Sequence, residues 1–467
     1  MKILVLNGSP KGPTSVTMQY IAYWQQRFPT HEFTVVHAAQ QQHLFEKSDA
    51  AFDEVMQKVT SAGLIIWAFP LYFLLVHSGY MRFIELIYER GKETVFKDTY
   101  TAAISTSIHF YDHTAHNYIH SVSDDLGMNY LGGIPAHMND LTKTEVRRSL
   151  DAVFSNWMEA AVHKLHTTPA FAPVRYTPKK LGELDTAKEV AAVDTGKRVC
   201  IVADLPSENS NLGEMVRLLQ SYFPHSEMLN LSTISMGPCR GCLKCGFDNR
   251  CVYGDRDEHY QQYRSKVLPA DILIFAGTLR HRYLSSRWQR YLERSFVHTH
   301  QPVLKNKQVA FLINGPLSQN YTAREVLTAY TETMGGNLVS IVSDEVHDSA
   351  ELSRNIEHVA RTLAAFSAGN VETPHSFLGV AGMKIFRDEI YKGLRFVFQA
   401  DDRFYRQQGL YDFPHKRRLF RTAISLMILV SKIPMVRRKI PTKMKQMMLR
   451  QYEEIIARTQ PVADTAT

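Results

Sequence analysis

The fold is decided by a stretch near the start of the chain, Ile3-Leu4-Val5-Leu6-Asn7-Gly8-Ser9-Pro10-Lys11-Gly12-Pro13-Thr14-Ser15. Its four leading apolar residues predict a short parallel strand buried on both faces. A loop of glycines, hydroxyls and one cation follows, and residues 15–27 have a helical pattern. A strand that runs through such a loop into a helix predicts an α/β domain with a ligand site at the carboxyl end of the strand.

Strands and helices alternate from this stretch onward. We expect strands at 33–36, 64–68 and 101–106, with helices at 53–61, 78–90 and 143–165. The pattern then restarts, with strands at 198–203, 227–231, 271–276 and 308–313 and helices at 285–296 and 323–334. This repetition predicts two doubly wound parallel-sheet domains in tandem. The expected division is 1–166 for the first domain, 167–196 for a linker, 197–370 for the second domain and 371–467 for a basic helical extension.

The loop after the first strand has the features of a phosphate site. Free N–H groups and the positive end of the helix dipole would face an anion there. The loop lacks the GxGxxG of dinucleotide sites and the GK[ST] of P-loops, so the monophosphate of FMN suits it best. Pro70 and Tyr72 alone could serve only to shape a loop and pack. The residues expected to meet at this sheet edge are Ser9, Pro10, Lys11, Gly12, Ser15, Thr17, Pro70, Leu71, Tyr72, Phe73, Ser105, Thr106 and Ser107.

Four of the five cysteines lie within thirteen residues, at Cys239, Cys242, Cys245 and Cys251. The spacing C-x2-C-x2-C-x5-C is typical of a loop that wraps a [4Fe–4S] cluster. Structural zinc commonly uses two separated C-x2-C pairs, and a disulfide framework spreads its cysteines along the chain. The spacing therefore favours a cluster, with zinc or redox-active or structural thiols as the alternatives. Cys200 lies in an apolar run and is expected to be a buried strand residue.

These motifs together resemble a known group. The first domain, with its Gly-Ser-Pro-Lys loop and its Pro70-Leu71-Tyr72 loop, resembles the NAD(P)H-dependent FMN reductases among flavodoxin-like proteins. The second domain resembles the iron–sulfur flavoproteins of that group, which place a compact four-cysteine loop after the second strand. The resemblance implies two flavodoxin-like folds, FMN and a [4Fe–4S] cluster as cofactors, and NAD(P)H or a ferredoxin as electron donor. It also implies dimers in which a cluster approaches the flavin of the neighbouring subunit, so we expect either a homodimer or the same approach within this tandem chain.

The second domain departs from the flavin-binding pattern. Asp204 and Glu208 stand where the first domain has a glycine and a cation, so a phosphate would meet negative charge. The Pro-x-Tyr loop is replaced by Gly277–Tyr283. We therefore expect FMN in the first domain only. Lys11 replaces the arginine that is usual in the group, which exchanges a planar fork for a point charge.

His109, His113, His116 and His120 are spaced so that they would share one face of a helix. Such a face could be a polar surface, a lid over the flavin or a metal site. His109 is the candidate for a catalytic role because it follows the strand at 101–106.

Charge is uneven along the chain. From His375 to the end there are 18 basic and 8 acidic residues, against 36 and 38 in the remainder. The basic clusters Lys416–Arg418 and Arg437–Lys439 flank an apolar run at 419–434 that is too short to cross a bilayer. This tail could pack on the domains, lie on an anionic membrane surface or bind an acidic redox partner.

The sequence therefore predicts an oxidoreductase that passes electrons between FMN and an iron–sulfur cluster. The absence of a secretory signal at the N-terminus favours the cytoplasm. Expected partners are a small-molecule or ferredoxin-type redox partner, and no nucleic acid, because neither domain has a basic recognition element. A plain NAD(P)H-dependent flavin or quinone reductase without a cluster and a non-catalytic redox sensor or scaffold are the alternatives.

Overall fold

The computed structural model describes residues 1–177, 192–193 and 195–413 and four single positions beyond them, at 422, 426, 433 and 435. The chain separates into a unit at Met1–Phe404 and a second unit at Tyr405–Thr467. Both α/β domains belong to the first unit. The predicted apolar run at 419–434 and both basic clusters of the tail lie outside the described residues, apart from isolated positions.

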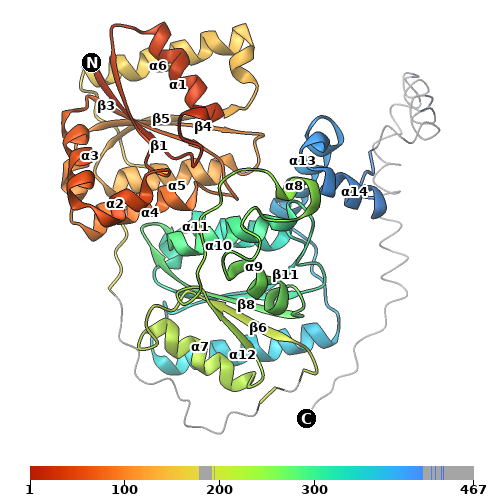
Figure 1. Ribbon diagram of the computed structural model, residues 1–467. Coiled ribbons are helices and arrows are strands. Elements are labelled where there is room, and N and C mark those ends of the chain that lie inside the picture. The colour runs from red at the N-terminus through yellow and green to blue at the C-terminus, as the bar shows by residue number, and fades with distance from the viewer. Residues whose placement is uncertain are drawn as a thin grey trace. The chain divides into compact units, whose positions relative to one another are not determined.

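The first domain is a parallel sheet with the strand order β2-β1-β3-β4-β5. Its strands are β1 (Lys2–Asn7), β2 (Glu32–Val36), β3 (Leu64–Pro70), β4 (Tyr100–Ser107) and β5 (Asn129–His137). Its helices are α1 (Val16–Arg27), α2 (Gln42–Lys47), α3 (Asp49–Ser61), α4 (Ser78–Glu89), α5 (Asp112–Asp125) and α6 (Thr144–Val162). Helices α1 and α6 cover one face of the sheet and α3, α4 and α5 the other (Figure 1). This is the doubly wound order of flavodoxin-type sheets.

The second domain repeats this design as β11-β10-β8-β6-β7, with the short strand β9 paired to β8. Its strands are β6 (Val199–Ala203), β7 (Glu227–Asn230), β8 (Ile272–Arg280), β9 (Tyr283–Leu284), β10 (Gln308–Asn314) and β11 (Asn337–Ser343). Its main helices are α7 (Asn211–Tyr222), α8 (Cys245–Asp248), α9 (His259–Gln262), α10 (Ser286–Ser295), α11 (Tyr321–Thr333) and α12 (Ser349–Ala368). Helices α7 and α12 pack on one face, and one apolar core that includes α10 and α11 continues into the first domain.

The tandem fold class is confirmed, and β5 and β11 complete the two sheets beyond the strands predicted from the sequence. The histidine run does not form one helical face, because α5 begins only at Asp112. His109 lies before it with a left-handed backbone (φ 62°).

The start of the C-terminal extension packs on both domains. It contains α13 (Phe377–Tyr391) and the first part of α14 (Gln399–Gln407). The Tyr111 hydroxyl of the first domain donates to the Leu378 carbonyl, and Glu332 of the second domain accepts from Ser376 and Gly379. These residues belong to the same compact unit as the two sheets. The boundary predicted at residue 371, between the second domain and the extension, stays a prediction. Within the described residues, no helix is both long and apolar enough to cross a membrane.

Candidate functional site

The loop after β1 is ordered by its own hydroxyls and amides. Asn7 accepts from the Ser9 N–H (2.9 Å) and donates to the Gly12 carbonyl (3.1 Å), and the buried Ser9 hydroxyl accepts from the Lys11 N–H (3.2 Å). Gly12 has a left-handed backbone (φ 58°), and a Cβ there would meet the Gln40 side chain at 2.5 Å. The loop leads into α1, whose first N–H groups have no partner within the helix. Ser15 caps this helix by accepting from the Met18 N–H. This is the cradle expected for a phosphate.

The carboxyl ends of β3 and β4 close against the same loop. The Thr17 and Thr106 hydroxyls lie 2.7 Å apart, which joins the start of α1 to the end of β4. The Leu71 N–H donates to the Thr106 carbonyl (3.2 Å). The predicted site residues on these strands therefore meet at one sheet edge.

Beside this edge, the partly buried His116 bonds to the hydroxyl of Ser105, one of the predicted site residues. The Ser105 hydroxyl lies 2.8 Å from His116 Nε2. Burial lowers the pKa of His116 to about 4, so its ring is neutral at neutral pH. Ser105 therefore has a fixed partner that carries no charge.

His109 is positioned by a carboxylate. Its Nδ1 lies 2.8 Å from Asp112 Oδ2, and its backbone N–H donates to the Ser107 hydroxyl (2.8 Å). Ser107 in turn donates to Asp112. The imidazole is 52% exposed, whereas Asp112 is largely buried. Both His109 and Tyr111 have positive φ (62° and 56°), a strained backbone of the kind that concentrates at functional sites.

The cysteine loop of the second domain lies directly against the predicted flavin loop of the first. Gly241, between Cys239 and Cys242, has φ +60°, and a Cβ there would collide with the Tyr72 hydroxyl and lie 3.1 Å from Lys11 Cε. His77 Nε2 lies 2.8 Å from the Cys239 carbonyl oxygen. Burial raises the pKa of Tyr72 well above its usual value, and the neighbouring acidic groups of Cys239, Glu293 and Cys242 raise it further.

The cysteine loop is also fixed to its own domain. The Arg294 guanidinium forms two hydrogen bonds with Asp257 (2.5 and 3.0 Å) and donates to the Gly237 carbonyl (2.8 Å). Asp257 accepts from the Gly237 N–H (3.1 Å), and the Tyr253 hydroxyl donates to the Pro238 carbonyl. Arg294 and Asp257 are both almost fully buried. Both the N–H and the carbonyl of Gly237, and the carbonyl of Pro238, therefore have side-chain partners that fix the backbone before Cys239.

The four predicted metal ligands differ in exposure. Cys242 is exposed, and the other three are partly buried. Burial raises the pKa of Cys245 to about 12 and that of Cys239 further, and the charge of Cys251 adds to both shifts. These thiols are close enough to affect one another, and binding of a metal would have to displace their protons. In the described part of the chain, no three His, Cys, Asp or Glu side chains form a group that could hold a metal ion.

The two domains meet through reciprocal contacts. The Ser78 N–H and hydroxyl donate to Glu293 (2.6 and 2.7 Å), and the Ser286 N–H and hydroxyl donate to Glu85 (2.6 and 2.7 Å). Ser286 follows Ser78, and Glu293 follows Glu85, by the same 208 positions. Each helix N-terminus is therefore bound by a carboxylate from the other copy, as in an interface between two identical subunits.

In the second domain, carboxylates occupy the edge that would bind a phosphate. Asp204 is buried directly after β6 and accepts from Ser285 and Arg287 (2.5 Å each). Asp344, after β11, is buried too and accepts from Asn314, Asn211 and the Gly315 N–H. Negative charge and filled hydrogen bonds leave this edge unsuited to an anionic cofactor.

Not every predicted residue faces the site. Phe73 packs between the domains, with ring centroids 5.5 Å from Phe296 and 5.7 Å from Tyr330. His113 pairs with Glu325 (3.0 Å), and His120 stacks on Tyr130 (3.9 Å between centroids), so the histidines do not converge.

Two residues of the contact between the loops, His77 and Arg294, were not among the predicted site residues. The signal that could have located them is the repeated pattern Arg-aromatic-aliphatic-Glu at Arg82–Glu85 and Arg290–Glu293. It aligns α4 with α10 and would have placed both helices at one interface.

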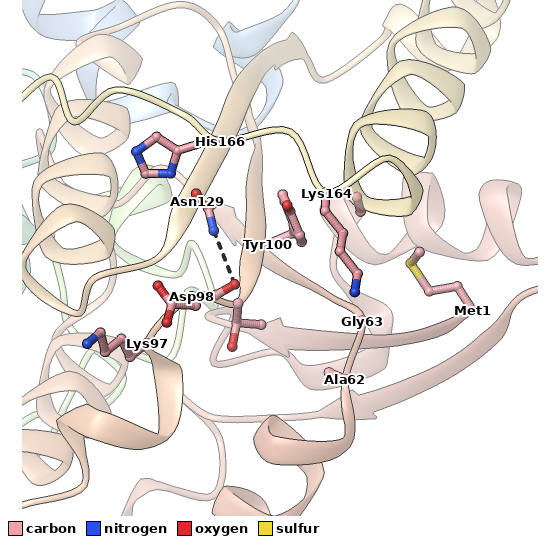
Figure 2. Close-up of a pocket in the computed structure, with 11 residues that line it drawn as sticks. Met1, Ala62, Gly63, Lys97, Asp98, Tyr100, Asn129, Lys164 and His166 are labelled. Atoms are coloured by element: carbon pink, nitrogen blue, oxygen red, sulfur yellow. Dashed lines mark hydrogen bonds between the residues drawn. The ribbon is translucent and has the colours of Figure 1, made fainter.

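A hollow of about 530 Å³ opens at the opposite edge of the first sheet (Figure 2). Its lining includes Gly63, Thr99 and Asn129, which stand at the beginnings of β3, β4 and β5. Doubly wound sheets bind ligands at the carboxyl ends of their strands, so a ligand is expected at the Ser9 edge and not in this hollow.

Comparisons with known proteins agree with the fold of the first domain. A family model of the flavodoxin-like fold matches residues 1–160. No curated protein matches the chain. Similar solved structures include an FMN-dependent NADH-azoreductase from Bacillus anthracis in complex with FMN (16% identity, 35% of this chain and 98% of that one, TM-score 0.26). Others are the flavoenzyme NAD(P)H:(acceptor) oxidoreductase FerB from Paracoccus denitrificans (15%, 34% and 98%, TM-score 0.28) and general stress protein 14 from Treponema denticola in complex with FMN (12%, 34% and 98%, TM-score 0.27). Residues 1–160 thus have a flavodoxin-like fold, and at these TM-scores the structures add no argument about function.

Proposed function

We propose that this protein is a flavin-dependent oxidoreductase in which FMN in the first domain exchanges electrons with a [4Fe–4S] cluster on Cys239, Cys242, Cys245 and Cys251. The observation that carries the proposal is the contact of Gly241 with Tyr72 and Lys11. It brings the cysteine loop of one domain to the predicted flavin site of the other within one compact unit. If each loop holds a redox group, this contact places the two groups close enough to exchange electrons.

The residues fit FMN at the first domain. The ordered Ser9 loop and the N-terminus of α1 would hold the phosphate, with Lys11 as its cation. Pro70, Leu71, Tyr72 and the ends of β4 would border the ring. Bound FMN would supply two-electron exchange with NAD(P)H and one-electron exchange with a ferredoxin-type donor or with a cluster.

The cysteine loop offers the chemical type of donor that an iron–sulfur cluster needs, although among the described residues no three such side chains are grouped around a metal position. Four thiols within a short loop, supported by the Arg294–Asp257 pair, are the ligand type that such clusters require. The buried Arg294 guanidinium, near Cys251, would offset part of the negative charge that four thiolates add.

His109 is the proposed proton donor and acceptor at the site. Asp112 holds its Nδ1, so Nε2 is left to exchange a proton with a bound substrate. The exposed imidazole at the end of β4 is where a substrate would approach.

Two sets of variants test the proposal. Cys242→Ala should remove iron and leave FMN bound, whereas Ser9→Ala combined with Lys11→Ala should remove FMN and leave iron. Iron, sulfide and flavin are assayed on protein purified without oxygen. If the unmodified chain contains flavin and no iron, the protein is a plain flavin or quinone reductase. If it contains neither flavin nor iron, it is a redox sensor or scaffold. Loss of flavin from folded Cys242→Ala protein would refute the assignment of two separate sites.

A further inference from the structure

His77 touches three parts of the molecule at once. It is buried directly before α4, and its Nδ1 accepts from the Gly79 N–H (3.0 Å). An N–H group can only donate, so Nδ1 has no hydrogen when the ring is neutral and Nε2 carries it. That hydrogen is directed at the Cys239 carbonyl oxygen, 2.8 Å from Nε2.

The same ring borders the flavin loop and the domain interface. The Tyr72 ring meets it edge-on, with centroids 4.8 Å apart. Glu293 Oε2, which also accepts from Ser78, lies 3.5 Å from Nε2. The imidazole therefore fixes a cysteine-loop carbonyl beside Tyr72.

The second copy shows what a helix cap alone requires. Ser285, 208 positions after His77, caps α10 by accepting from the Trp288 N–H (3.3 Å), and its hydroxyl binds Asp204 of its own domain. Serine is a preferred residue at such a position and histidine is not. The imidazole of His77 is longer than a serine side chain, so it caps the helix and also bonds to the cysteine loop of the other domain.

We propose that His77 is a positioning residue that holds Cys239, and through it the cluster, beside the flavin so that electrons pass between them. The inference rests on the proposed function. In the step it supports, a reduced flavin loses one electron and the oxidised cluster gains it, and no covalent bond forms or breaks. Mutation of a group that hydrogen-bonds to a metal ligand commonly lowers metal affinity or activity by about 10-fold to 100-fold.

Two substitutions of His77 separate its cap of the Gly79 N–H from its hydrogen bond to the Cys239 carbonyl. His77→Asn keeps an acceptor near the Nδ1 position for the Gly79 N–H, and its side chain is too short to reach Cys239. His77→Gln keeps a donor near the Nε2 position and weakens the cap. Ser285→Ala is the matched control at the corresponding position of the second domain.

The first readout is electron transfer in protein that carries both groups. The flavin is reduced by light in the presence of EDTA, and bleaching of the flavin and of the cluster is followed separately. We expect His77→Asn to keep both groups and to slow cluster reduction by about 10-fold to 100-fold, while His77→Gln and Ser285→Ala retain most of the rate. Equal rates in His77→Asn and the unmodified protein would overturn the inference. A merely structural role would instead make His77→Gln as slow as His77→Asn.

The second readout needs no bound group. In metal-free protein, alkylation of Cys239 by iodoacetamide is measured by mass spectrometry, with Cys200 as an internal buried reference. Faster alkylation of Cys239 in His77→Asn, and not in Ser285→Ala, supports the inference, and unchanged alkylation overturns it. If the unmodified protein binds no iron, the proposed function fails while this assay still tests the hold of His77 on the loop.

Discussion

The two domains differ most sharply at the residue that follows the first strand. In the first domain this residue is Gly8, whose N–H donates to the Ala68 carbonyl, and in the second it is Asp204, whose N–H donates to the Ala276 carbonyl (2.8 and 3.0 Å). The backbone is alike, and the two edges differ in the side chain at this position. Gly8 has no side chain, and this leaves room for the Tyr80 ring, because a Cβ at position 8 would collide with a ring carbon. In the second domain, the Asp204 carboxylate binds Ser285 and Arg287 instead.

The comparison shows how a duplicated domain can divide a task. In the proposed function, the first copy keeps a phosphate loop, and the second fills that edge with carboxylates and contributes a cysteine loop to the site of the first. The reciprocal Ser–Glu contacts keep the copies in the orientation that makes this division possible.

The largest expected effect is on the reciprocal interface. Glu293→Ala removes a fully buried carboxylate that accepts two hydrogen bonds from Ser78. A hydrogen bond to a charged group contributes about 1.5–3 kcal/mol, so losing both costs about 3–6 kcal/mol. Urea denaturation should show a loss of this size, and Glu85→Ala at the corresponding position should lose a similar amount. Unchanged stability in either variant would contradict the reciprocal interface.

A second prediction concerns the proton exchange that only the first copy is expected to perform. His109→Asn should lower turnover with a quinone acceptor by about 100-fold, the lower range for loss of a general acid. His113→Asn is the matched control, because His113 is similarly exposed (51%) and bonded to Glu325. Steady-state kinetics with both variants carrying flavin measures this difference. Equal losses in the two variants would remove His109 from the proposal.

A third prediction concerns pH. Desolvation lowers the pKa of the partly buried His116 to about 4 in the folded chain, below the usual value of about 6.5. The unfolded chain therefore binds the proton first as pH falls, and stability is lost between about pH 6.5 and 4. From pH 7 to pH 5 this one residue costs about 2 kcal/mol. Urea unfolding at both values should show a smaller loss in His116→Gln than in the unmodified chain, and an identical loss would contradict the assignment.

The smallest effect is the sharpest test of the contact between the copies. Gly241 and Gly254 both have positive φ (60° and 56°), but a Cβ at Gly254 would meet nothing within 4 Å. Alanine at either position strains the backbone equally, whereas Gly241→Ala also pushes against Tyr72. We expect Gly241→Ala to weaken FMN binding by about tenfold, which corresponds to a modest overpacking cost, and Gly254→Ala to leave it unchanged. Fluorescence titration with FMN measures both, and equal affinities would place the flavin away from the cysteine loop.

Much of the fold could be predicted from local pattern, because buried parallel strands leave continuous apolar runs such as Leu64–Ala68. The strands β5 and β11 were not predicted, since their faces are mixed; β5 contains two glycines and one proline. The loop between β1 and α1 was also predictable, because strand, loop and helix adjoin in sequence, whereas its phosphate binding stays a prediction.

The contact between the loops could be expected only as a hypothesis. His77 and Cys239 are 162 residues apart, and their hydrogen bond depends on how two domains pack. Periodicity does not report such packing. Likewise, the steps of four and three in the histidine run suggested one face, but the left-handed backbone at His109 and Tyr111 delays the start of α5 to Asp112.

The central claim is that one flavin in the first domain serves one cluster on the second. The most direct measurement is the content of FMN, iron and sulfide per chain in protein purified without oxygen. We predict one FMN and about four irons per chain, with flavin lost from Ser9→Ala/Lys11→Ala protein. Two flavins per chain, or a chain that binds FMN and no iron, would contradict the claim.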